Sequence, residues 1–256
     1  MKKVTIGLML LCAAFTTAAA DLTRAEVEQR LQQADKAHVA DLKRKELTDM
    51  DLWGFDFRNA NLWGTDLRRS NLSHTNLSGL VLDLTVMTKT NFSHADLSNT
   101  SVFGVSVGGA NLSHANLSGS RFIATLDRAD LSYANLTKID WGVDMKNQSM
   151  GLMRANMNNV NLTGADLTDA NLDRATLRYA NFTNSIVKNA NLFGVDLSGA
   201  DFTNADLSGA NLTGTTLEET NFTGANLNGT RFAGIKDKSK LKGLSESKNL
   251  DKAIFD

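Results

Sequence analysis

A five-residue repeat runs through most of this chain and constrains its fold more than any other feature. Each unit has a small residue, Asn or Asp, a large apolar residue and two small or polar residues, as from Ala165 to Asp169. In an α-helix an apolar residue at every fifth position would advance by about 140° per unit and form no stripe. In a flat strand successive apolar residues would point to opposite faces, because five is odd. The chain must therefore bend once in every unit.

The same pattern predicts that bent units stack on one another. The small residue and the large apolar residue are two positions apart, so both can face an interior while the Asn or Asp between them faces out. The last two residues suit a corner, because Gly accepts unusual φ angles and Ser or Thr can bond to the nearby backbone. Such a piece buries its apolar side only against copies of itself, as in a solenoid. A slower period of twenty residues, seen at Phe182, Phe202 and Phe222, predicts four units per coil.

These units resemble the motif A(D/N)LXX of the pentapeptide-repeat family over residues 40–234. The resemblance implies an all-β solenoid, a right-handed quadrilateral β-helix. It implies little about function, because one fold can host many functions. Some members resemble duplex DNA and protect topoisomerases from drugs, which implies an acidic, cytoplasmic rod. This chain has a formal net charge of −1. We therefore rank a DNA-mimic function behind the alternatives given below, and we expect no nucleic-acid partner.

The first twenty residues predict export. Lys2 and Lys3 precede an apolar stretch from Val4 to Phe15 and the small residues 18–20. This is the pattern of a secretory signal peptide cleaved after Ala20, which predicts a periplasmic or secreted protein. We expect no membrane span, since the apolar stretch is shorter than about 20 residues. Cys12 is the only cysteine, so the cleaved chain would have no disulfide, thiol nucleophile or thiolate metal site.

Short α-helical caps are expected at both ends of the solenoid. Over residues 21–39, Thr23 and Glu26 form a capping box ahead of apolar residues at helical spacing, which predicts an amphipathic capping helix. A helix that docks on a partner or membrane surface is the alternative. After Gly234 the repeat ends, and residues 235–256 predict one or two short helices that cover the last coil. Their apolar residues are Leu241, Leu244, Leu250, Ile254 and Phe255.

The repeat has one irregular region. After Phe122 its phase slips back by one residue, residues 142–149 fit no clear unit, and the original phase resumes at Leu152. We expect the loss and the later gain to cancel over one coil, leaving a local bulge. Residues 143–147 would then form a protruding corner, either functional or a tolerant loop.

A histidine column is the first candidate site. Three histidines recur every twenty residues, which predicts imidazoles on one face about 4.8 Å apart. They could bind a divalent metal, or repel one another when protonated and make the face responsive to pH. The alternative is solvated histidines copied by duplication, because no carboxylate or thiol completes a ligand set. The column consists of His74, His94 and His114, followed by Tyr133, Arg154 and Arg174.

A group of apolar residues at outward positions is the second candidate site. In the twenty-residue register they gather on one side of the first coils, which predicts contact with a protein partner or with a second copy in a homodimer. Scattered exposure, or cover by the N-terminal helix, is the alternative. They are Trp63, Val81, Leu84, Val86, Phe103 and Ile123.

No catalytic constellation stands out from the repeat. Acids such as Asp166 and Asp196 occupy the Asn/Asp position, so the fold explains them. We therefore expect a non-catalytic, exported scaffold that interacts with an unidentified protein and needs no cofactor. A metal-binding or pH-responsive periplasmic protein is the first alternative and the DNA mimic the second.

Overall fold

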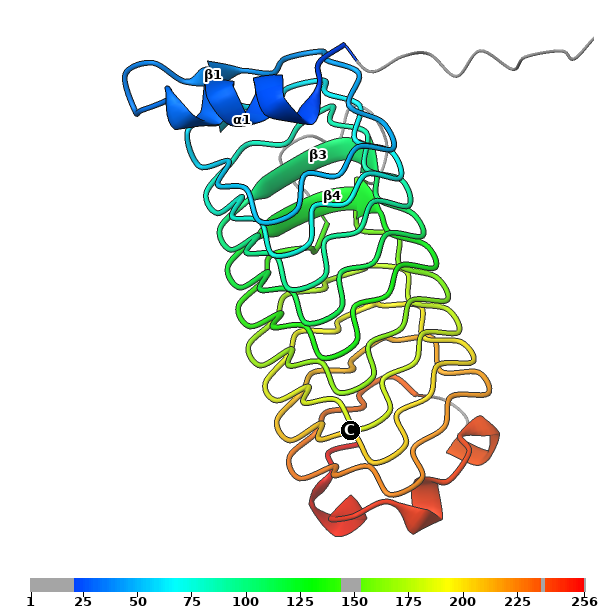
Figure 1. The fold of residues 1–256 in the computed structure, drawn as a ribbon. Coiled ribbons are helices and arrows are strands. Elements are labelled where there is room, and N and C mark those ends of the chain that lie inside the picture. The colour runs from blue at the N-terminus through cyan, green and yellow to red at the C-terminus, as the bar shows by residue number, and fades with distance from the viewer. Residues whose placement is uncertain (1–20, 144–152, 236–237, 256) are drawn as a thin grey trace, which may run out of the picture.

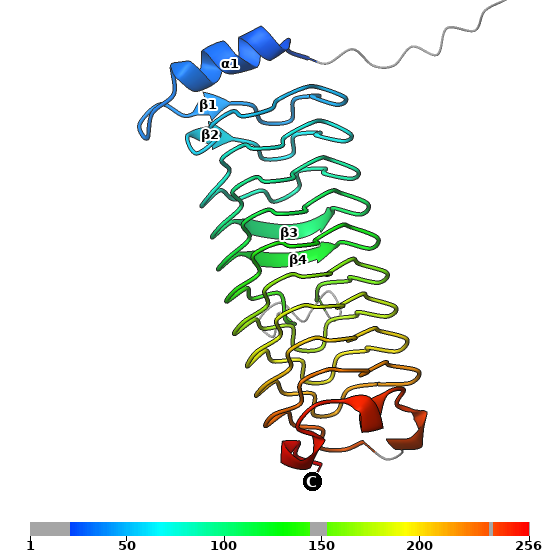
Figure 2. The same ribbon diagram turned by 60° about the horizontal axis from the view of Figure 1, so that its bottom comes forward.

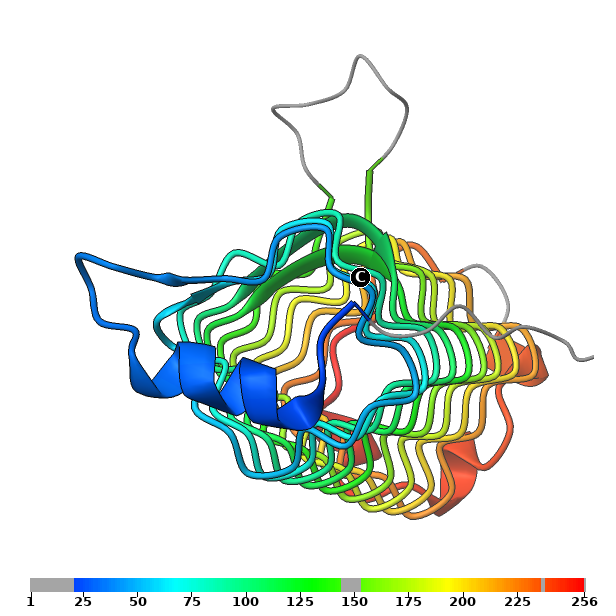
Figure 3. The same cartoon turned by 45° about the horizontal axis from the view of Figure 1, so that its top comes forward.

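The computed structural model describes residues 21–143, 153–235 and 238–255, and the predicted signal peptide lies outside them. Figure 1 shows an elongated rod of stacked coils. Parallel bridges join residues twenty positions apart, as in Asn71↔Asn91 and Asn91↔Asn111, and four such columns run along the rod. Figure 3 shows the coils in projection as a four-sided outline. The fold is a right-handed quadrilateral β-helix, so the expected fold class is confirmed.

The corners follow from the unit itself. Ala165 N–H donates to Leu162 O at 3.0 Å, which closes a four-residue turn, and its third residue, Gly164, has φ +67°. A positive φ at this position defines a type II turn. The Asn or Asp holds the corner from the side: the Asp166 carboxylate accepts from Thr168 N–H at 2.9 Å and from the Thr168 hydroxyl at 2.6 Å. This explains why the position takes Asn or Asp.

The core is a set of columns of large apolar residues inside the rod. The side chains of Leu72 and Leu192 are fully buried. Phe182, Phe202 and Phe222 stack with ring centroids 4.4 and 5.5 Å apart. The second inward position mostly takes small residues, and a Ser or Thr there bonds to a backbone carbonyl inside the core. Examples are the hydroxyls of Thr65, which donates to Leu42 O at 2.7 Å, and Thr90, which donates to Leu67 O at 2.7 Å.

Four short strands belong to the first coils. β1 (Ala40–Asp41) pairs in parallel with β2 (Ala60–Asn61), and β3 (Ser101–Ser106) with β4 (Arg121–Thr125). We number the coils from these positions, so that coils 1 to 4 begin at residues 40, 60, 80 and 100. The register shifts within the second pair, because Ser101 pairs with Arg121 but Ser106 pairs with Thr125. This shift is the one-residue slip seen in the sequence.

The expectation that the slip cancels over one coil is wrong. Thr125 bridges to Asn156 and Asn135 to Asp166, which are 31 residues apart in place of 20. The chain between Asp140 and Asn156 therefore contains more residues than a regular coil needs. Of the predicted protruding corner at 143–147, only Val143 lies among the described residues, where its N–H donates to Asp173 O at 2.9 Å.

The N-terminal cap is α1 (Arg24–Gln32), shorter than the expected segment. The predicted capping box is present: the Thr23 hydroxyl accepts from Glu26 N–H, and the Glu26 carboxylate accepts from Thr23 N–H at 2.7 Å. Val27 is fully buried. Figure 2 shows α1 lying across the first coil.

The C-terminal cap contains no α-helix in its described residues, contrary to expectation. It is a further coil that bridges to the preceding one at Lys242, Lys248 and Ile254, 21, 22 and 23 residues beyond their partners. These spacings exceed twenty, and the extra residues wind into the 3₁₀ helices η2 (Lys238–Lys240), η3 (Leu244–Glu246) and η4 (Leu250–Lys252). Phe255 stacks on Phe232 at 4.9 Å and helps to close the core. Among the described residues, no helix has the length and apolar character to cross a bilayer.

Candidate functional site

The structure brings five of the six outward apolar residues together. Val81 and Leu84, on coil 3, are 59% and 50% exposed. Trp63 and Phe103 are half-buried on the same side of the neighbouring coils 2 and 4, and Val86 is half-buried beyond the corner, on the next side of coil 3. Leu84 occupies a corner position with φ +61°, which favours glycine, so its side chain is held outward. We call Trp63, Val81, Leu84, Val86 and Phe103 the apolar patch, and the side of the rod that carries Val81 the Val81 side.

Ile123 does not belong to the apolar patch, which corrects the sequence-based assignment. Its side chain is 2% exposed. Along the extended β4, Ile123 lies between Phe122 and Ala124, which belong to the core, so its side chain faces the outside of the rod. It is buried there because it lines a small hollow with Met153 and Arg154, and the repeat pattern does not show that those residues lie against it.

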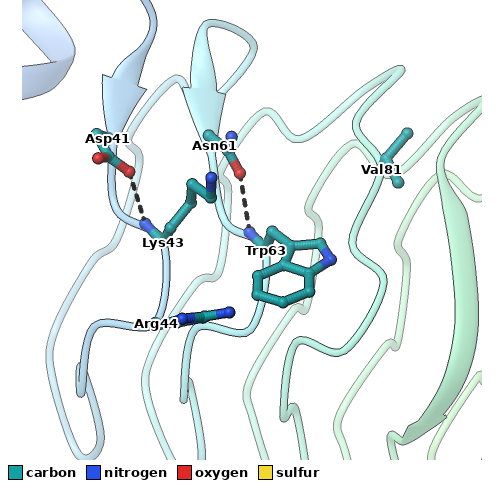
Figure 4. Close-up of a pocket in the computed structure, with 6 residues that line it drawn as sticks. All are labelled: Asp41, Lys43, Arg44, Asn61, Trp63 and Val81. Atoms are coloured by element: carbon teal, nitrogen blue, oxygen red, sulfur yellow. Dashed lines mark hydrogen bonds between the residues drawn. The ribbon is translucent and has the colours of Figure 1, made fainter.

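A hollow of about 580 Å³ lies beside the apolar patch on the Val81 side. Figure 4 shows the indole of Trp63 between the coil that carries Asn61 and the coil that carries Val81. The Arg44 guanidinium lies 4.8 Å from the Trp63 ring, a cation–π contact. The rest of the lining is Asp41, Lys43, Arg44, Asn61 and Val81.

Charged groups near the apolar patch are incompletely paired. Lys43 and Arg44 are exposed and form no ion pair within the described part of the chain. Asp83 lies between Val81 and Leu84 on coil 3, and its Oδ1 atom is buried without a hydrogen-bond partner. An unpaired buried acceptor costs about 1–3 kcal/mol. A donor brought by a binding partner would offset that cost.

The histidine column forms a ladder of stacked rings. His74 and His94 are 4.8 Å apart with planes 7° from parallel, and His94 and His114 are 4.8 Å apart at 3°. Tyr133 stacks on His114 at 5.1 Å and Trp53 contacts His74 at 5.9 Å. All three histidines are exposed and occupy corner positions with positive φ. The ladder is an exposed aromatic ridge on one side of the rod.

The stacked geometry does not direct the imidazoles toward a common metal ion. The lone pair of an imidazole nitrogen lies in the ring plane, and parallel planes 4.8 Å apart do not converge on an ion bound at about 2.0–2.1 Å. No group of three or more His, Cys, Asp or Glu side chains within the described ranges is placed to hold a metal. Coordination by two of these histidines would require their rings to rotate, and the metal hypothesis stays a prediction.

Arg154 and Arg174 do not continue the ladder. After Tyr133 the next coil places Gly164 there, and a Cβ on Gly164 would collide with the Tyr133 ring. Arg174 lies on the Val81 side, because Asn171 pairs with Asp140 and Asn191. The expectation that Arg154 and Arg174 follow Tyr133 in the histidine column is wrong. The 31-residue spacing moves every later unit to a different side of the rod.

Two acids with lowered pKa values owe the shift to a neighbouring arginine. Arg69 donates to the Asp49 carboxylate at 2.7 and 2.6 Å and holds the pKa of Asp49 below its ordinary value. Arg58 does the same to the pKa of Asp56 through its side-chain hydrogen bonds. These exposed pairs contribute little to stability and do not form a paired-acid catalytic site.

Comparison with known proteins gives one family. The model of the family described as pentapeptide repeats matches eight copies in this chain, over residues 40–73, 65–101, 104–140, 155–194 and 190–229. These ranges span more than half of the sequence. No curated protein sequence matches the chain.

Solved structures with pentapeptide repeats are also similar to this chain. HetL, involved in heterocyst differentiation regulation in the cyanobacterium Nostoc sp. strain PCC 7120, is 28% identical, with 91% of this chain and 94% of HetL covered and a TM-score of 0.35. A pentapeptide repeat protein from the thylakoid lumen of Arabidopsis thaliana is 22% identical, with 43% and 67% covered and a TM-score of 0.35. QnrB1, a plasmid-mediated fluoroquinolone resistance protein, is 19% identical, with 82% and 93% covered and a TM-score of 0.38. Because these TM-scores are low, the family of this chain is established by the match to the family model.

Proposed function

The chain belongs to the pentapeptide-repeat family, and from that premise we propose that it is an exported, non-catalytic rod that binds a protein partner through the apolar patch. The observation that carries this proposal is the exposure of Val81 and Leu84, 59% and 50%, next to each other on one coil. Exposed apolar residues grouped in this way are typical of contact sites. The basic groups of Lys43 and Arg44 at the edge of the patch add a polar rim.

Export rests on the N-terminal sequence, with Lys2 and Lys3 before the apolar stretch and small residues before Asp21. Cell fractionation with mapping of the mature N-terminus tests it, and the expected first residue is Asp21. An uncleaved protein in the cytoplasm would refute export and would favour the DNA-mimic alternative.

Site-specific crosslinking in cells tests the patch. A photoreactive residue at Val81 should capture a protein, whereas the same residue at Ile186, which is 39% exposed on another side of the rod, should not. Leu84→Asp should abolish capture from Val81 because it places a charge in the apolar contact, and Ile186→Asp is the matched control. Capture that survives Leu84→Asp would refute the patch as the contact site.

A metal-binding or pH-responsive role for the histidine ladder is the second candidate. The observation that favours it is the set of three exposed, parallel imidazoles at 4.8 Å spacing. Titration with zinc or copper should distinguish the wild type from His94→Ala in binding or in melting temperature. Equal behaviour of the two proteins ends the metal hypothesis.

A further inference from the structure

Neighbouring coils are joined by a regular hydrogen-bond ladder on each side of the rod. Between coils 1 and 2, on the side that carries the histidines, Leu52 N–H donates to Asn71 O at 2.8 Å and Gly54 N–H donates to Ser73 O at 3.0 Å. In the opposite direction, Asn71 N–H donates to Met50 O at 2.9 Å. Each rung therefore uses two donors of one coil and one donor of the next.

The ladder is broken between coils 2 and 3 on the Val81 side. The corresponding donors there are the N–H groups of Leu62, Gly64 and Val81, and none of them has a hydrogen-bond partner among the described residues. The corresponding acceptors, the C=O groups of residues 60, 81 and 83, likewise accept no hydrogen bond from the residues that the structure describes. The break is local, because on the next side Val86 N–H donates to Thr65 O at 2.9 Å. Six backbone groups thus face each other without pairing.

Leu80 lies at the break. It occupies the inward position where the neighbouring coils have Ala60 and Thr100. Its side chain is half-buried, whereas Thr100 is fully buried. Coil 3 keeps its bonds to coil 4 at this point, since Leu82 N–H donates to Ser101 O at 2.8 Å. The break therefore concerns coil 2 alone, and we attribute it to Leu80.

The hollow beside the apolar patch lies at the break. It has a volume of about 580 Å³ and extends over the outer face of coils 1 to 3, from Asp41 to Val81, with the Trp63 indole on its lining (Figure 4). Asp41 pairs in parallel with Asn61, whereas Asn61 and Val81 form no bridge within the described part of the chain. The Asp83 carboxylate, with its unpaired Oδ1, belongs to the same edge of coil 3.

We propose that this break is a slot that accepts one extended segment of a partner protein as an inserted β-strand. The proposal rests on the proposed function, because it takes the apolar patch as the partner site. Donors and acceptors at strand spacing on two facing edges are matched by an extended polypeptide backbone, as in β-strand addition. Val81 and Leu84 would contact apolar side chains of that segment. Lys43 and Arg44 lie on coil 1, so an acidic side chain at the end of the segment nearest coil 1 would complement their charge.

Amide hydrogen exchange of the full chain tests whether the slot exists. The N–H groups of Leu62, Gly64 and Val81 should exchange at least about tenfold faster than the bonded N–H groups of Leu52 and Asn71. In Leu80→Ala, and equally in Leu80→Thr, coil 3 should form the missing hydrogen bonds to coil 2. The three amides should then be as protected from exchange as those of Leu52 and Asn71. Equal protection in the wild type would overturn the slot.

A tethered peptide tests whether the slot takes a strand. The probe is the peptide Cys-Gly-Thr-Val-Thr-Val amide, joined by a disulfide to Lys43→Cys in a chain that also carries Cys12→Ser. Tethering gives the probe a high effective concentration. It should protect the amides of Leu62, Gly64 and Val81 and shift the fluorescence of Trp63. The same peptide with N-methylated Thr and Val should do neither, because it cannot pair as a strand.

The outcomes separate this inference from the proposed function. Protection by both peptides, or by neither, overturns strand insertion. A partner that crosslinks from Val81 equally well in wild type and in Leu80→Ala supports the apolar patch and overturns the slot. Absence of any crosslink from Val81 overturns the proposed function itself, whatever the peptide does.

Discussion

Replacing Phe202 with alanine should remove the middle ring of a stack in the core. The Phe202 side chain is fully buried, with its ring 4.4 Å from that of Phe182 and 5.5 Å from that of Phe222. A buried Phe→Ala change costs about 3–5 kcal/mol from lost transfer energy and the remaining cavity. Each aromatic pair contributes about 0.5–1.5 kcal/mol of this. Phe202→Leu keeps most of the volume and should cost about 1–3 kcal/mol.

Amide exchange resolves this loss along the rod. In a solenoid each coil contacts only its neighbours, so the destabilisation should concentrate in the affected coils. The opening free energy of the Phe182 N–H, bonded to Asp201 O at 2.7 Å, should fall by the cost of the substitution. That of the distant Leu52 N–H should change much less. A loss below about 1 kcal/mol at Phe182, or an equal loss at Leu52, would refute the stacked-column account of the core.

Two further predictions concern single corners and caps. Gly243→Ala should lower stability more than Gly54→Ala in denaturant unfolding: both glycines have positive φ, but a Cβ on Gly243 would lie 2.6 Å from the Thr223 nitrogen, whereas one on Gly54 meets nothing within 4 Å. The hydrogen bond from Thr23 N–H lowers the pKa of Glu26 from 4.5, so its stabilisation of α1 is present above that pH and is lost as pH falls through the lower folded-state value. Chemical shifts of α1 should report this loosening, and Glu26→Gln should abolish its pH dependence.

The regular part of the fold could be predicted from sequence because the five-residue period reports side-chain direction directly. Leu72 and Leu192 point inward as expected, and Thr23 and Glu26 form the expected capping box. The period does not report which side of the rod a unit occupies, since all four sides share it. The 31-residue spacing after Thr125 therefore moves Arg174 to the Val81 side while the local pattern looks undisturbed.

The candidate site was predicted in part for the same reason. Val81 and Leu84 break the pattern at outward positions, which marks them as exposed. Ile123 breaks it in the same way but is buried, because it lines a hollow with Met153 and Arg154. Those two residues come from a later part of the chain, and a single unit carries no information about that contact.

Leu80 shows how one residue can convert a regular solenoid into a binding site. In a solenoid whose backbone groups are all hydrogen-bonded between coils, the sides of the rod offer no free donor or acceptor to a partner strand. Pro or a charged residue at an edge would also block strand pairing. A Leu in the inward position instead leaves six groups unpaired at one place, next to Val81 and Leu84. Local departures from an otherwise consistent pattern are where function is expected, because the rest of the fold offsets their cost. On this reasoning Leu80→Ala should make the rod more stable and, at the same time, unable to accept the strand.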